Sequence, residues 1–221
     1  MNKIKELSSY LELGSHVADI VEHTLTLPEP KLILPTGSTP LSLYKELVSR
    51  ELDWSHVVTY NLDEYVDNTI QDQSYRYFMM ENLFKLTNMN DDNIYFPGDT
   101  AVWPDLSYGT EVDLCLLGIG GNGHIAFNEP GSSFESRTRV VDLDEQTIKD
   151  NSRFFDSVDD VPKQAITMGL GTIMESKKIV LMANGVNKLN ILNVAMNGEV
   201  TEDIPASILQ NHDNVEVYYC D

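Results

Sequence analysis

Short apolar runs alternate with helical patterns along most of this chain, and that alternation constrains the fold more than any other feature. Apolar residues recur at helical spacing in 41–48, 75–83 and 189–195, and a further helix is centred on Val17–Leu25. Strands that alternate with helices predict a mostly parallel sheet covered by helices on both faces. The predicted strands are Leu32–Leu34, Val57–Tyr60, Asn93–Phe96, Val112–Leu117, Arg139–Leu143, Ile179–Met182 and Val215–Tyr219.

We therefore expect an α/β fold, with a single doubly wound, mostly parallel sheet of a modified Rossmann-like kind. A chain of 221 residues is within the range of one domain and too short to require two. We see no internal repeat and no dividing linker, so residues 1–221 are predicted to form one domain. Ligands of such sheets bind at the carboxyl ends of strands, which directs attention to the loops after the strands.

The charge balance excludes two classes of partner. With 15 basic and 35 acidic residues, the formal net charge is −20, which would repel nucleic acid and anionic membranes. The N-terminus does not resemble a signal peptide, and no apolar stretch has the length of a membrane span. Cys115 and Cys220 lie in apolar runs and are expected to be buried free thiols, so we expect a cytoplasmic protein.

The first loop that could bind a ligand lies in KLILPTGSTPLSLY. After the strand come Thr36, Gly37, Ser38 and Thr39, and then Pro40 opens the next helical pattern. Gly37 would allow a tight turn, Thr39 suits an N-cap and Pro40 the first helical position. The N–H groups there would favour a phosphate, although an ordinary capped helix has the same sequence.

The second loop lies in VVTYNLDEYV. It brings Asn61, Asp63, Glu64 and Tyr65 to the carboxyl end of a predicted strand. Adjacent acids at a strand end could supply a general base. They could equally form a solvated turn.

The third loop, LGIGGNGHIAFNEP, permits two interpretations. Gly118, Gly120 and Gly123 fit a dinucleotide-binding pattern. That pattern belongs in a first strand–helix–strand unit, whereas here it lies in the middle of the chain, and Pro130 interrupts any helix early. The dinucleotide interpretation, and with it a nicotinamide-dependent oxidoreductase, is therefore disfavoured.

The alternative is a catalytic loop built around a histidine. His124 can carry protons near neutral pH, and Glu129 could fold back to orient its ring. A lone histidine is more often structural, but this one lies in a glycine-rich loop after a buried strand.

Two isolated cations complete the set. Lys188 falls in the first turn of a predicted helix, where a lysine is unfavourable unless an anion is also present. Arg153 could grip a phosphate through two hydrogen bonds. Either could instead be an ordinary surface residue.

Taken together, the loops resemble the glucosamine-6-phosphate deaminase family. The resemblance runs from about Lys31 to Asn190 through PTGSTPLSLY, NLDEY, LGIGGNGHIAFNEPG, SRTR, NSRFF and VPKQAITMGLGTI, in that order. The related 6-phosphogluconolactonases share the strand–Gly–His theme but lack Asn128-Glu129-Pro130. The resemblance implies conversion of glucosamine 6-phosphate and water to fructose 6-phosphate and ammonia, with no metal and no organic cofactor.

The resemblance also implies residue roles. Asp63 matches the base that moves a proton between C2 and C1, His124 the residue that opens the sugar ring, and Glu129 its partner. Asn122 stands where some members carry an aspartate that helps the histidine, so ring opening here would depend more on Glu129. The implied phosphate-binding set is Thr36, Gly37, Ser38, Thr39, Arg153 and Lys188.

This chain is shorter than the allosteric, hexameric members of that family, which favours a monomer or a small homo-oligomer. Two alternatives to a deaminase remain open at this point. One is a hydrolase acting on 6-phosphogluconolactone, and the other is a non-catalytic sensor of sugar phosphates.

Overall fold

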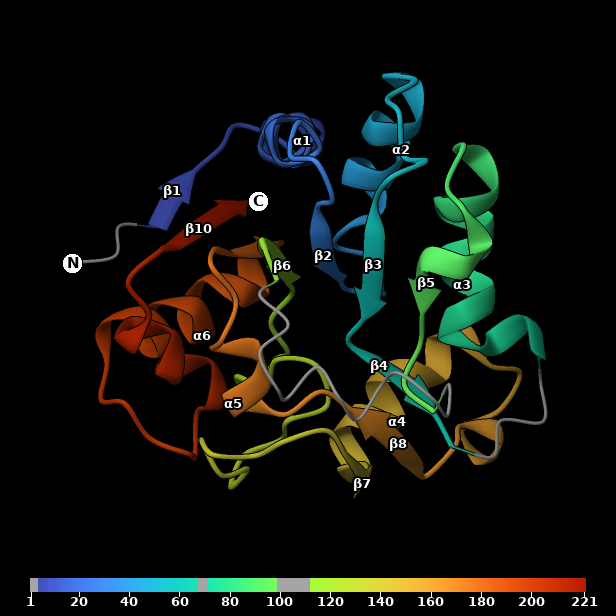
Figure 1. Ribbon diagram of the computed structural model, residues 1–221. Coiled ribbons are helices and arrows are strands. Elements are labelled where there is room, and N and C mark those ends of the chain that lie inside the picture. Colours follow the sequence, from blue (N-terminus) through green and yellow to red (C-terminus); the bar gives the residue numbers. More distant parts are fainter. Residues whose placement is uncertain (1–3, 67–70, 99–111) are drawn as a thin grey trace.

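A seven-stranded sheet forms the centre of the molecule (Figure 1). The computed structural model describes residues 4–66, 71–98 and 112–221. Every strand pairing recorded in this sheet is parallel. In spatial order the strands are β1 (Ile4–Glu6), β10 (Val215–Cys220), β9 (Ile179–Asn184), β6 (Leu114–Leu117), β2 (Lys31–Leu34), β3 (Val58–Asn61) and β5 (Ile94–Tyr95).

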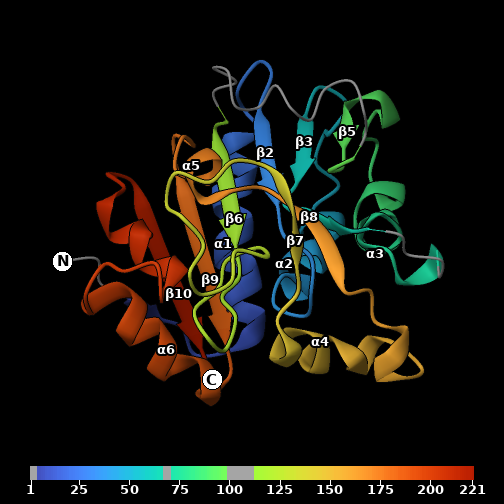
Figure 2. The same ribbon diagram turned by 90° about the horizontal axis from the view of Figure 1, so that it is seen from below.

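Helices cover both faces of the sheet, as Figure 2 shows. One face packs against α1 (Tyr10–Thr24), α2 (Leu41–Ser49) and α3 (Tyr75–Asn82). The other packs against α5 (Leu170–Ile173), α6 (Val186–Asn197) and the 3-10 helix η7 (Pro205–Asn211). Alternate residues of a strand serve the two cores: Val180 faces the first and Leu181 the second. The prediction of a doubly wound, mostly parallel sheet is confirmed.

A second sheet was not expected. It has three antiparallel strands in the order β4 (Asp63–Tyr65), β8 (Gln164–Thr167) and β7 (Arg139–Asp142). The prediction that Arg139–Leu143 belongs to the main sheet is therefore wrong. An alternating pattern identifies a strand with one solvated face but does not say which sheet the strand joins. In β7 the solvated face includes Val140, which is 53% exposed.

Several short elements also escaped sequence prediction. They are β1, β4, β8, α5 and α4 (Glu145–Asn151), of which the longest has seven residues. Segments this short have little periodicity of their own and depend on tertiary pairing.

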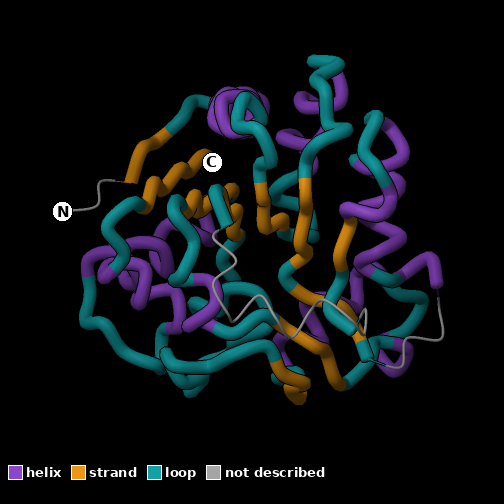
Figure 3. The backbone as a smooth tube through the Cα atoms, viewed as in Figure 1, coloured by secondary structure: helices purple, strands orange, loops and turns teal. Residues whose placement is uncertain are grey.

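The order of strands places a topological switch between β2 and β6. From β2 the chain proceeds outward through β3 and β5, and it then returns to build β6, β9 and β10 on the other side. Because the strands are parallel, the loops that follow β2, β3, β6 and β9 all emerge at one edge. The small sheet lies beyond that edge (Figure 3), and a crevice at such a switch is where ligands of these folds bind.

Two further expectations can be compared with the structure. Cys115 and Cys220 are both buried free thiols, as predicted. Among the described residues, no helix combines the length and apolar character needed to cross a membrane.

Candidate active site

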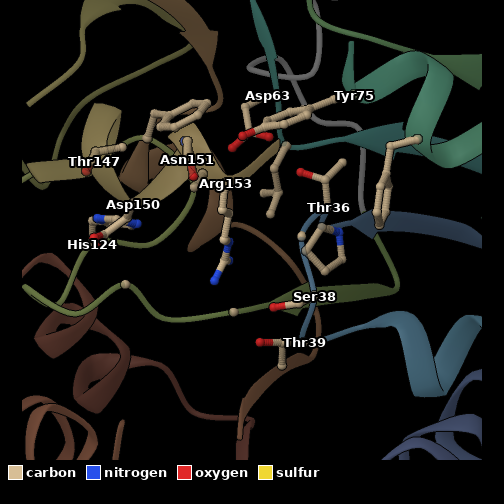
Figure 4. Close-up of a pocket in the computed structure, with 18 of the residues that line it drawn as sticks. Thr36, Ser38, Thr39, Asp63, Tyr75, His124, Thr147, Asp150, Asn151 and Arg153 are labelled. Atoms are coloured by element: carbon tan, nitrogen blue, oxygen red, sulfur yellow. The ribbon is translucent and has the colours of Figure 1, made fainter. Parts of the chain in front are cut away.

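A cavity of about 920 Å³ opens at the switch-point edge of the sheet (Figure 4). The loops after β2, β3, β6 and β9 line it, together with parts of α3 and α4. It brings together eight of the ten predicted site residues, which are Thr36, Gly37, Ser38, Thr39, Asp63, His124, Arg153 and Lys188. The other two, Asn122 and Glu129, do not line the cavity.

Asp63, the first residue of β4, is a buried carboxylic acid. Its side chain reaches the cavity, yet the residue is only 6% exposed. Burial, with a smaller contribution from the charge of Glu64, raises its pKa to about 8. An aspartate with such a pKa in a cleft has the properties of a general acid or base.

Glu64, beside it, has a different task. Its carboxylate accepts hydrogen bonds from the backbone N–H groups of Tyr75 (3.0 Å) and Arg76 (2.8 Å), at the first turn of α3. The two adjacent acids of the NLDEY loop therefore have different roles. Asp63 points into the cavity, and Glu64 holds the start of α3, which forms part of the cavity wall.

His124 and Glu129 form a pair at the end of the β6 loop. Nδ1 of His124 lies 3.2 Å from Oε2 of Glu129, within ion-pair range, although the two atoms are not aligned for a hydrogen bond. His124 reaches the cavity, and Glu129 lies behind it. The expected folding-back of Glu129 onto the histidine is therefore present.

Glu129 is held as an anion. Burial by itself raises its pKa, but the neighbouring His124 ring, the Thr147 hydroxyl and the Asn122 amide outweigh burial and lower the pKa to about 2. The Asn122 amide donates to Oε2 at 2.7 Å, and the Thr147 hydroxyl donates to Oε1. An ionised carboxylate beside Nδ1 favours a proton on that nitrogen, which leaves Nε2 as the acceptor.

Asn122, which stands where some members of the family carry an aspartate, acts on the histidine only indirectly. Its side-chain oxygen accepts from the backbone N–H of His124 at 3.2 Å, and its amide donates to Glu129. Asn122 thus fixes the loop and the carboxylate, and no hydrogen bond to the ring is recorded for it.

The glycines of this loop make room for the histidine. A Cβ built on Gly120 would lie 2.2 to 2.4 Å from atoms of the His124 ring, so only glycine fits beneath the imidazole. No helix begins between β6 and β7. Without a helix N-terminus to receive a pyrophosphate, the dinucleotide interpretation fails.

The loop after β2 differs from its predicted form in two respects. Gly37 has a φ of +92°, as a tight turn requires. However, α2 begins at Leu41 rather than Pro40, and the Thr39 hydroxyl donates to Oδ1 of Asn184 at 3.1 Å instead of capping the helix. The hydrogen-bond partner of Thr39 lies on β9, far away in the sequence, so the local sequence could not predict it.

Lys188 and Arg153 reach the same cavity from different elements. Lys188 lies in the first turn of α6, as predicted, and its ammonium donates to the Ile119 carbonyl at 2.9 Å. Burial lowers its pKa, Asp150 opposes this, and the nearby Arg153 lowers it further. Arg153 points into the cavity on the side of Ser38 (Figure 4). Two cations this close, beside a helix N-terminus, favour an anion between them.

Sequence reasoning missed several residues of the site. Asn184 ends β9, so the rule that polar residues after strands line the site could have found it. Thr147 and Asn151 gave no such signal, since they are polar residues of a short helix. Asn151 donates to the Tyr65 hydroxyl at 3.0 Å, and other unforeseen polar side chains of the lining include Tyr75 and Asp150.

In the part of the chain that the structure describes, no group of three His, Cys, Asp or Glu side chains is arranged to hold a metal ion. The polar groups of the cavity are instead suited to a ligand that carries both an anion and hydroxyl groups.

Comparison with known families agrees with this geometry. A profile of the glucosamine-6-phosphate isomerases and 6-phosphogluconolactonases matches residues 9–218. The chain belongs to this family. The match covers the small sheet, the large sheet except β1 and the last residues of β10, and every described loop that lines the cavity.

Within this family, the chain is much more similar to deaminases. A glucosamine-6-phosphate deaminase of Streptococcus uberis is 47% identical, with 97% of this chain and 95% of the relative covered. One of Malacoplasma penetrans is 45% identical, with 96% and 95% covered. The solved structure of a monomeric glucosamine-6-phosphate deaminase superposes with a TM-score of 0.93 at 37% identity, covering 99% of this chain and 97% of the other.

The likeness to structures of the lactonase branch shows the fold alone. A putative 6-phosphogluconolactonase from Neisseria gonorrhoeae superposes with a TM-score of 0.75 at 22% identity, with both chains fully covered.

Burial of Asp63 predicts a pH-dependent stability. Because its pKa in the folded protein (about 8) lies above its ordinary value of 3.8, the folded state holds a proton that the unfolded state releases between these values. This contribution to stability is complete below pH 3.8 and is lost as the pH rises through about 8. Asp63→Asn should therefore melt on the order of 10 °C above the wild type near pH 9 and close to it near pH 4.

Thermal denaturation of the wild type and Asp63→Asn between pH 4 and about pH 9 tests this prediction. Asp72→Asn, at an exposed aspartate of the same cavity, is the control and should show little change. The same Tm difference at both ends of the range would contradict a raised pKa for Asp63.

Proposed function

We propose that this chain converts glucosamine 6-phosphate and water to fructose 6-phosphate and ammonia, by aldose–ketose isomerisation coupled to deamination. The observation that carries the proposal is the meeting of three groups in one cavity. A buried aspartate, a histidine backed by a carboxylate and a pair of cations at a helix N-terminus all reach it. The similarity to deaminases over nearly the full chain supports the same reaction.

The phosphate would act as the anchor. Arg153, Lys188 and the loop 36–39 would hold it, and the binding energy would position C1 and C2 of the sugar near the other end of the cavity. A molecule with a net charge of −20 needs such a local set of cations and dipoles to bind an anionic substrate.

Ring opening would be the task of His124. Nε2 would take the proton of the anomeric hydroxyl and deliver it to the ring oxygen, which breaks the C1–O5 bond and forms the aldehyde. Glu129 would hold the Nδ1 proton and stabilise the imidazolium that forms in passing.

Isomerisation would then pass through Asp63. The aldehyde acidifies the proton on C2, and the carboxylate would remove it to give an enolamine and return it to C1. The result is an iminium at C2; water adds to that carbon, and ammonia leaves as the ketone of fructose 6-phosphate forms. The ammonium group of the substrate would lower the pKa of Asp63 on binding, so the base would ionise when it is needed.

We also propose that residues 1–221 act as one domain, because both sheets contribute to the cavity. A cytoplasmic location and a monomer or small homo-oligomer would suit such an enzyme, and the structural relative at 37% identity is described as monomeric.

Incubation with glucosamine 6-phosphate tests the reaction. We expect ammonium and fructose 6-phosphate to appear in equal amounts, because the C2–N bond breaks once for each ketose formed. Measured in parallel, hydrolysis of 6-phosphogluconolactone without ammonia release would favour the lactonase, and binding without turnover would favour a sensor.

Asp63→Asn should fold and lose nearly all deamination, since an amide cannot accept the C2 proton. General base catalysis contributes about 10²- to 10⁴-fold, and kcat should fall by a factor in that range. Asp72→Asn is the matched control at the same cavity and should keep most of the rate. If Asp63→Asn retained more than about a tenth of the wild-type rate, another residue would be the base.

His124→Gln should slow the cyclic sugar more than an acyclic analogue, because glutamine cannot carry a proton between the two oxygens. The measurement is kcat/KM for both substrates in the wild type and the variant. Asp63→Asn, in contrast, should lose both reactions alike. Equal losses in His124→Gln would argue against a role in ring opening.

A further inference from the structure

Two tyrosines outside the cavity hold carbonyl groups of the loop after β2. The Tyr10 hydroxyl, in the first turn of α1, donates to the Ser38 carbonyl at 2.5 Å. The same oxygen accepts from the backbone N–H of Ser42 at 3.0 Å, in the first turn of α2. One hydroxyl therefore ties the loop to the start of the helix that follows it.

The second tyrosine acts at the other end of the loop. Tyr44 of α2 is fully buried, and its hydroxyl donates to the Pro35 carbonyl. Neither tyrosine lines the cavity, whereas Pro35 and Ser38 both do. The Tyr44 ring belongs to the core between the sheet and helices α1, α2 and α3, and the partly buried Tyr10 ring packs against that core, so both approach the loop from behind.

The planarity of the peptide bond gives these contacts a consequence for the ligand. In a trans peptide the C=O and the next N–H point in opposite directions, and the described chain has no cis peptide. A Pro35 carbonyl held toward Tyr44 directs the Thr36 N–H the other way. In the same manner, a Ser38 carbonyl held toward Tyr10 directs the Thr39 N–H away from α1.

We propose that Tyr10 and Tyr44 are positioning residues of the phosphate site: their hydroxyls turn two carbonyls away from the ligand and so aim the N–H groups of Thr36 and Thr39 at its phosphate. The inference rests on the proposed function, since it deepens the role of the loop 36–39. Carbonyl oxygens facing a phosphate would repel it, whereas N–H groups would bind it.

A close helix contact lets Tyr10 reach the loop. A Cβ on Gly14 would lie 2.6 Å from the Ser42 carbonyl carbon, so α1 can approach the start of α2 this closely only with glycine there. Tyr10 and Gly14 are one helical turn apart in α1 and lie on the same side of it. The sequence thus supplies both the hydroxyl and the space that it needs.

Tyr10→Phe and Tyr44→Phe test the proposal, because phenylalanine keeps the ring and removes only the hydroxyl. The measurements are kcat and KM for glucosamine 6-phosphate, and the affinity for inorganic phosphate by competitive inhibition and by calorimetry. We expect KM and the phosphate dissociation constant to rise together by about 5- to 20-fold, with kcat within about twofold of the wild type.

Tyr218→Phe is the matched control. Tyr218 belongs to the same core, and its hydroxyl contacts Lys5 and Glu216, on strands β1 and β10. This variant should bind phosphate as the wild type does. A merely structural role of the tyrosine hydroxyls would lower the Tm of all three variants without a selective loss of phosphate binding.

Unchanged phosphate affinity in Tyr10→Phe would overturn the proposal. That variant decides the matter if Tyr44→Phe does not fold, because the Tyr10 ring is only partly buried. Calorimetry with phosphate needs no turnover, so it separates the two hypotheses. If the wild type binds phosphate but releases no ammonia, the proposed deamination is refuted, and the positioning role of the two tyrosines can still be tested by phosphate binding. If the wild type binds no phosphate, the positioning role is refuted.

Discussion

The common direction of the strands in the large sheet is the constraint on which the rest of the structure depends. Strands β2, β3, β6 and β9 are far apart in sequence, but parallel pairing brings their carboxyl ends to one edge. The switch between β2 and β6 then parts the loops that follow, and the cavity occupies the space between them. The small antiparallel sheet closes this space from the far side and carries Asp63 on its first strand.

Electrostatics inside the cavity oppose the average charge of the molecule. A chain with 20 more acidic than basic residues brings Arg153 near Lys188 in the cavity, and burial together with the Arg153 charge lowers the pKa of Lys188. Asp63 is the converse case, an acid whose burial favours its neutral form until a cation approaches. Both arrangements cost stability in the empty protein, and a ligand with a phosphate and an ammonium group would relieve both.

The β6 loop shows how one sequence pattern can serve a purpose different from the one that its spacing suggests. Its three spaced glycines fit a pyrophosphate-binding turn, yet Gly120 is required because the His124 ring lies against its Cα. Asn122 connects the loop backbone with Glu129. Spacing along the chain could not distinguish these cases, because the loop folds back on itself and opens no helix.

The sequence by itself determined the doubly wound sheet, through its alternating apolar periods, and it placed reactive side chains at strand ends, as with Asp63, His124 and Lys188. Tertiary structure alone decided which of these share a cavity and what stands behind them. Thr147 reaches Glu129 only because α4 packs next to the small sheet, and Thr39 bonds to Asn184 only because β2 and β9 end at the same edge. Local sequence fixes periodicity and residue chemistry, whereas contacts between distant segments arise only when the chain is compact.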